Sequence, residues 1–148
     1  MKRQNNDIDE NFYISFDRDL YKNSSIFNSI KFVDIHINYF KEVYYFSLIR
    51  KRSNKCLGSA CFGLNKENNM CNPLNGSYGG FEFSDVISYE IKDKFINFVI
   101  NYLNHKNPNI ISIILSPDIY NIDNNSNLLS ILLRLNFNIE NIEVNQYI

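Results

Sequence analysis

The stretch Pro73-Leu-Asn-Gly-Ser-Tyr-Gly-Gly-Phe-Glu-Phe83 decides the fold, because it joins a region of strand-like pattern to a region of helix-like pattern through a double glycine. Glycine lacks a Cβ atom and adopts dihedral angles that other residues avoid. Gly79 and Gly80 therefore indicate either a strand edge that a ligand approaches closely, or a bulge or tight turn. The neighbouring segments are needed to decide between these two interpretations.

The residues before the double glycine predict antiparallel strands. Val43–Arg50 and Leu57–Leu64 are two apolar runs joined by a polar turn, which favours a hairpin. The second run contains several small residues, so we expect a large side chain to pack on it: Gly58, Ser59, Ala60 and Gly63. Apolar and polar residues alternate over positions 33–38, a period that predicts a further half-buried strand.

The residues after the double glycine predict a helix between two strands. Tyr78–Phe83 is expected to form a short third strand, and Ser84 and Asp85 supply N-cap chemistry for an amphipathic helix that ends near residues 104–108. The β-branched run Ile110–Leu115 predicts a strand covered on both faces. Because a helix connects the two strands, we expect them to be parallel.

The last quarter of the chain predicts a helix and a closing strand. Ser116-Pro117 is suited to start a helical turn, and Asn127–Leu135 is apolar nearly all round, as in a deeply packed helix. Asn136 stands where a left-handed residue closes a helix. Phe137–Ile148 then alternates like a strand. The sequence therefore predicts an α/β fold of the α+β type, with a mixed sheet, an antiparallel meander, a central helix crossover and a C-terminal helix and strand.

Length and charge limit the classes of function. A chain of 148 residues predicts one domain over residues 12–148, preceded by a loose tail over residues 1–11 that lacks periodicity. The 15 basic and 16 acidic residues give a net charge of −1, so we expect no DNA binding by a general positive field. The basic cluster Arg50-Lys51-Arg52 is interpreted as a solvated hairpin tip rather than a phosphate site.

The cysteines and the hydropathy pattern indicate a cytoplasmic protein. Cys56, Cys61 and Cys71 form no Cys-x-x-Cys pair, so neither a disulfide framework nor a metal site is predicted. The sequence shows no signal peptide and no apolar run of about 18 residues, so we expect no membrane insertion.

The order of these elements resembles the GNAT acyltransferase fold. Leu132-Leu-Arg-Leu-Asn-Phe137 is similar to the Leu-Gly-Phe ending that recurs in that superfamily, with Asn136 in place of glycine. Three segments resemble the N-terminal half of FemAB-like tandem GNAT proteins: Tyr78-Gly-Gly-Phe-Glu-Phe83, Leu115-Ser-Pro-Asp-Ile-Tyr120 and Val144-Asn-Gln-Tyr-Ile148. The resemblance covers Phe32 to Ile148.

The resemblance implies transfer of an acyl or aminoacyl group to an amine, with acyl-CoA or aminoacyl-tRNA as the donor. Gly79, Gly80 and Phe81 would then line the donor cleft, where exposed backbone amides polarise the acyl carbonyl. Glu82 follows at the mouth of that cleft and is the candidate general base. The alternative for Glu82 is a carboxylate that stabilises the positive end of the following helix.

One departure from the family pattern favours a second hypothesis. Family members that use coenzyme A carry a glycine-rich loop at the start of the central helix, whose amides hold the pyrophosphate. The corresponding segment here, Glu82–Ile87, has no glycine and contains two acids. The alternative function is a non-catalytic binding or assembly module that lacks a coenzyme A site. Its partner would be a second GNAT-like domain, or another copy in a homodimer.

Overall fold

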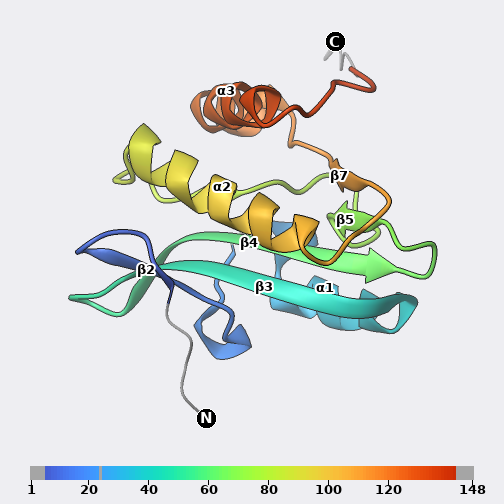
Figure 1. Cartoon of the computed structure of the whole chain (residues 1–148), viewed down its shortest axis with the longest axis horizontal. Coiled ribbons are helices and arrows are strands. Elements are labelled where there is room, and N and C mark those ends of the chain that lie inside the picture. The colour runs from blue at the N-terminus through green and yellow to red at the C-terminus, as the bar shows by residue number, and fades with distance from the viewer. Residues whose placement is uncertain (1–5, 24, 143–148) are drawn as a thin grey trace.

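The protein has a mixed α/β fold with a seven-stranded, mostly antiparallel open sheet and three α-helices, as a computed structural model shows (Figure 1). The structure describes residues 6–23 and 25–142, without the side chains of residues 118, 119 and 121. The strands are β1 (Asn6–Asp7), β2 (Phe12–Ser15), β3 (Phe40–Arg50), β4 (Lys55–Asn65), β5 (Met70–Asn72), β6 (Glu82–Phe83) and β7 (Ile111–Ile113). Their order is β1-β2-β3-β4-β5-β7, and β6 also pairs with β4.

The predicted hairpin is confirmed as β3 and β4, the two longest strands. Their side chains alternate between two core clusters, because successive residues of a strand face opposite sides. Phe46 and Phe62 belong to the larger cluster, and Tyr45 and Cys61 belong to the smaller one. The small residues of β4 receive large rings as expected: a Cβ on Gly58 would lie 2.7 Å from the Phe83 ring.

Residues 33–38, predicted to be a strand, lie instead in helix α1 (Ile30–His36) and the 3-10 turn η3 (Ile37–Tyr39). The Ser29 hydroxyl caps α1 by accepting a hydrogen bond from the Phe32 amide at 3.3 Å. Only Val33 of α1 is buried, while Ile35 is 70% exposed. The alternation of apolar residues therefore did not reflect a buried strand face.

Helix α2 (Tyr89–Asn104) lies between the sheet and helix α3 (Asp118–Arg134), whereas α1 lies on the opposite side of the β3–β4 ladder (Figure 1). The helix starts later than predicted, because the N-cap is Ser88 rather than Ser84 or Asp85. Its buried residues extend over a wider arc than one face, since the sheet covers one side and α3 covers another. They are Phe95, Ile96, Val99, Ile100 and Leu103.

Strand β7 is parallel as predicted, but it pairs mainly with β5, which the sequence did not reveal. β7 is the last strand in the sheet order, and Ile110 and Ile114 beside it are 58% and 51% exposed, so the expected cover on both faces is wrong. Within the described residues, no helix is both long enough and apolar enough to cross a membrane.

The two ends of the chain differ from expectation. In the segment predicted to be a loose tail, Asn6–Asp7 form β1 and pair with β2, and residues 1–5 lie outside the described part. Residues 137–142 form no strand, and the remainder of the predicted closing strand, residues 143–148, lies outside the described residues. Helix α3 starts at Asp118 after Pro117 without a side-chain cap.

The end of α3 gives a test of local backbone geometry. Asn136 has a φ of 66°, which confirms the predicted left-handed closing residue. We expect Asn136→Gly to leave the free energy of unfolding unchanged or slightly raised, since glycine has no Cβ penalty there. Asn136→Val should lower it by about 1–2 kcal/mol. Urea unfolding of both variants checks this, and equal stability of the two would contradict the left-handed conformation.

Candidate functional site

The double glycine lies where the hydrogen-bond ladder of β4 changes partner. β4 pairs with β5 at Gly63–Leu64 and with β6 at Gly58–Ser59, and residues 73–81 leave the sheet between these two points. Gly79 returns to make a parallel bridge with Leu115, and its amide donates to the Ile114 carbonyl at 2.6 Å. Only Glu82–Phe83 of the predicted strand Tyr78–Phe83 pairs with β4.

Asn72 fills this interruption with its side chain. Its Oδ1 accepts a hydrogen bond from the Gly80 amide at 2.5 Å, and its Nδ2 donates to the Gly80 carbonyl at 3.3 Å. The same Nδ2 donates to the Cys61 carbonyl of β4 at 2.8 Å. Asn72 is only 1% exposed, and its side-chain amide supplies hydrogen-bond partners to three backbone groups, which are costly to leave unpaired in the interior.

Two further buried asparagines hold the same segment. Asn28 Nδ2 lies 3.4 Å from the Gly80 carbonyl as a donor, and Asn124 Nδ2 donates to the Phe81 carbonyl at 3.0 Å. The Asn28 carbonyl in turn accepts from the Tyr21 hydroxyl at 2.8 Å. The backbone from Gly79 to Phe81 is therefore fixed by side chains from three separate parts of the chain.

This geometry answers the question that the sequence left open about the glycines. A Cβ on Gly79 would collide with Asn72 Oδ1 and lie 3.0 Å from Pro73 N, and Gly80 has a φ of +93°. The glycines allow Asn72 to reach the backbone, so they form a tight bend rather than an open edge. An oxyanion role requires amides that are free to donate, but the amides of Gly79 and Gly80 already donate to internal acceptors.

Phe81, the third predicted donor-site residue, belongs to the core. It is 3% exposed, and its ring contacts those of Phe62, Phe83 and Phe95 with centroids 5.9–6.5 Å apart. Its side chain therefore packs between the sheet and α2 rather than facing a donor.

Glu82, the candidate base, does line a pocket. Its Oε2 accepts a hydrogen bond from the Ser25 amide at 3.1 Å, which attaches the segment before α1 to β6. The pocket has a volume of about 370 Å³ and is lined by Lys22, Asn23, Cys56, Leu57, Gly58, Ser59, Glu82, Phe83 and Ser84. Five residues separate Glu82 from the Ser88 N-cap of α2, and its hydrogen bond goes to Ser25 instead. Glu82 therefore does not stabilise the helix N-terminus, which was the alternative role.

Two polar side chains on the β4 side of the pocket, Ser59 and Cys56, donate to nearby backbone carbonyls. The Ser59 hydroxyl donates to the Lys22 carbonyl at 2.7 Å, and the Cys56 thiol donates to the Gly58 carbonyl at 3.3 Å. Burial raises the pKa of the neighbouring Tyr21 hydroxyl well above its ordinary value, and the charge of the Glu82 carboxylate raises it further. Tyr21 therefore stays neutral and acts as a hydrogen-bond donor.

A row of aromatic rings crosses the surface beside the double glycine. Adjacent ring centroids are 4.5–6.1 Å apart along the whole series. This aromatic row consists of Tyr120, Tyr78, Phe27, Phe32, His36 and Tyr39. Its end members Tyr120 and Tyr39 are 64% and 63% exposed, and the others are half-buried.

Sequence reasoning missed the three buried asparagines and the aromatic row. Asparagine is frequent in this chain, so Asn72 carried no signal apart from its place before a proline. The rings of the row come from three parts of the chain, residues 27–39, Tyr78 and Tyr120, that approach one another only in the fold. Among residues 6–23 and 25–142, no group of three or more His, Cys, Asp and Glu side chains is placed to hold a metal ion.

Comparison with known proteins does not identify a relative. No protein-family model, no curated protein and no solved structure matches this chain.

The bend at the double glycine can be tested by adding one methyl group. We expect Gly79→Ala to lower the free energy of unfolding by about 1–3 kcal/mol, because the new Cβ displaces Asn72 from Gly80. The exposed neighbour Ser77 serves as the control, and Ser77→Ala should change stability by less than about 0.5 kcal/mol. Urea unfolding measures the free energy of unfolding of both variants. A Gly79→Ala variant as stable as the wild type would show that the bend is not packed against Asn72.

Proposed function

We propose that this chain is a non-catalytic, protein-binding module with a GNAT-like arrangement of elements. The observation that carries the proposal is that the Gly79 and Gly80 amides donate to Ile114 and Asn72, so neither is free to polarise an acyl carbonyl. The GNAT-like part rests on element order. Antiparallel strands β2, β3 and β4 are followed by α2, the parallel strand β7 and α3, as in the family that the sequence resembles.

The start of α2 also supports a module without coenzyme A. The Ser88 hydroxyl already accepts a hydrogen bond from the Ile91 amide, and Glu90 places a carboxylate in the first turn. A pyrophosphate needs free amides and positive charge at such a helix start. The segment before the cap, residues 84–87, supplies no glycine that would let backbone amides approach a phosphate.

The aromatic row is the surface that we assign to partner binding. Contiguous exposed apolar surface marks interaction sites, and tyrosine is enriched in protein interfaces. We commit to a second copy of this chain as the partner. Aromatic rings are self-complementary, since the edge of one ring packs on the face of another. The row contains no carboxylate or ammonium group, so two copies of it would meet without repulsion between like charges.

Sedimentation equilibrium tests this interface. We expect a concentration-dependent dimer whose dissociation constant rises at least about tenfold in Tyr39→Ser/Tyr120→Ser, because exposed interface tyrosines often contribute strongly. The control is Tyr89→Ser, which removes an exposed tyrosine from α2 outside the row. A wild-type chain that remains monomeric at every concentration, or a dimer weakened equally by the control, would contradict the proposal.

Acyl transfer is the second candidate function, and the placement of Glu82 in the 370 Å³ pocket favours it. A carboxylate in a pocket could accept the proton of an amine acceptor. The two candidates differ in their response to donors. A binding module should give no heat on titration with acetyl-CoA or aminoacyl-tRNA and should form no acylated amine. A transferase should consume the donor, and Glu82→Gln should slow that reaction by about 10²–10⁴-fold.

A further inference from the structure

The three basic residues at the β3–β4 turn, Arg50, Lys51 and Arg52, have different surroundings. Lys51 faces β1, where its Nζ lies 3.0 Å from Asp7 Oδ1 and donates to the Asp9 carbonyl at 2.8 Å. Arg50 and Arg52 instead line a separate pocket of about 450 Å³. The expectation of a solvated hairpin tip holds for Lys51 and Arg52, which are exposed, whereas Arg50 is the half-buried last residue of β3.

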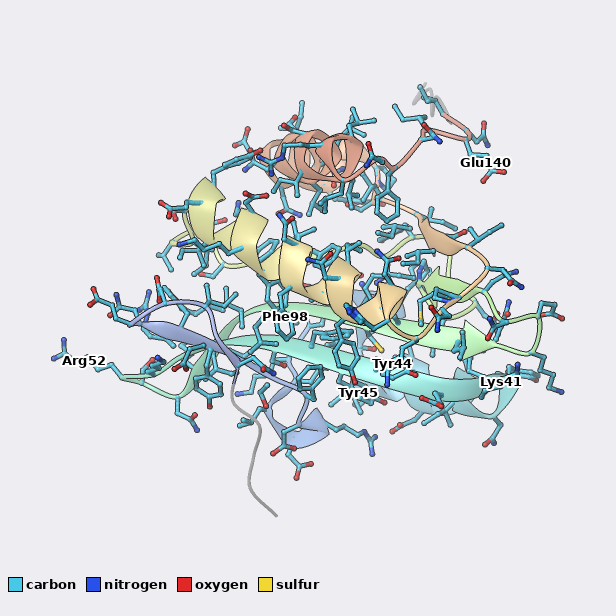
Figure 2. The ribbon with its side chains drawn as sticks, viewed as in Figure 1. Lys41, Tyr44, Tyr45, Arg52, Phe98 and Glu140 are labelled. Carbon is cyan, nitrogen blue, oxygen red and sulfur yellow. The ribbon has the colours of Figure 1, made fainter. Side chains whose placement is uncertain are left out.

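The rest of this pocket is largely apolar. Its lining residues come from the start of β2, the end of β3, the segment before α2 and the first turn of α2: Asn11, Phe12, Arg50, Arg52, Val86, Ile87, Ser88 and Ile91. The Arg50 guanidinium lies 5.8 Å from the centre of the Phe12 ring, which holds it against the pocket wall. Arg52 extends outward from the hairpin tip (Figure 2) and forms the outer rim.

Three carboxylates near this pocket have other partners, while Glu10 and Asp85 are exposed acids next in sequence to the lining residues Asn11 and Val86. Asp7 pairs with Lys51, and Asp9 Oδ1 accepts from the Asn11 and Phe12 amides at 2.7 and 2.8 Å. Glu90 on α2 pairs with Lys94 at 3.0 Å. In the described part of the chain, neither pocket arginine has a carboxylate oxygen within 4.0 Å. Arg50 and Arg52 therefore both line this cavity, Arg52 at its outer rim, and neither is paired with a carboxylate of the described residues.

We propose that this arginine pocket binds a phosphate monoester whose apolar body rests on Phe12, Val86 and Ile91. A phosphate monoester carries a charge of about −1.5 to −2 and three acceptor oxygens, which suit two guanidinium forks. The volume is within the range of about 300–1,000 Å³ for small-molecule sites, and apolar walls with a few polar groups are typical of them. The site does not depend on the aromatic row or on the double glycine.

Isothermal titration with phenyl phosphate tests the pocket. We expect saturable binding that Arg50→Gln and Arg52→Gln each weaken by at least about tenfold, since a lost hydrogen bond to a charged group has an effect of that order. Lys31→Gln is the matched control, because it removes an exposed positive charge from α1, outside the pocket. Phenol and inorganic phosphate should each bind more weakly than phenyl phosphate, because each supplies only one half of the contact.

Three results would overturn the proposal: no saturable binding by the wild-type chain, equal weakening by Lys31→Gln, or benzoate binding as tightly as phenyl phosphate. Arg52 lies at the exposed hairpin tip, so its variant is expected to fold even where Arg50→Gln lowers stability. Urea unfolding of each variant separates a loss of binding from a loss of structure. The titration is also separate from the dimer measurement, since the arginine pocket and the aromatic row share no residue.

Discussion

The fold depends on the contact between the Asn72 side chain and the Gly80 backbone. The β4 ladder is interrupted where residues 73–81 leave the sheet, and an interruption inside a core leaves backbone groups that must find partners. One buried amide side chain supplies them to Cys61 and Gly80 together. The cost of leaving such groups unpaired, about 1–3 kcal/mol each, explains why a glycine is needed at position 79 for Asn72 to reach them.

The same contact connects the interior to the two surfaces that we assign to binding. The loop of residues 73–81 carries Tyr78 into the aromatic row, and its return to the sheet as β6 fixes the segment that leads into α2. That segment forms one wall of the arginine pocket. The backbone geometry around the bend thus positions both surfaces.

The sequence predicted those parts of the fold that depend on neighbouring residues in the chain. The β3–β4 hairpin, the core face of α2, the parallel direction of β7 and the left-handed Asn136 follow from periodicity, turn residues and chain connectivity. Local patterns did not predict the short elements, because tertiary contacts outweigh weak propensity there. The predicted strand around residue 35 is the helix α1, and β5 was not predicted. For the candidate site, Glu82 lines a pocket, but Gly79, Gly80 and Phe81 do not line it with Glu82. The sequence also did not reveal that the glycines surround a buried asparagine. That contact joins residues eight positions apart with no pattern between them.

The exchange rate of the Gly80 amide hydrogen tests this account most directly, because that hydrogen is the one donated to Asn72 Oδ1. We expect it to be protected nearly as strongly as the amides of β3 and β4, with an opening free energy close to that of global unfolding. NMR in deuterated buffer would measure the exchange rates of Gly80 and of the β3 and β4 amides in one sample. Exchange of Gly80 as fast as that of exposed Ser77 would contradict the account and would return the double glycine to the role of an open strand edge.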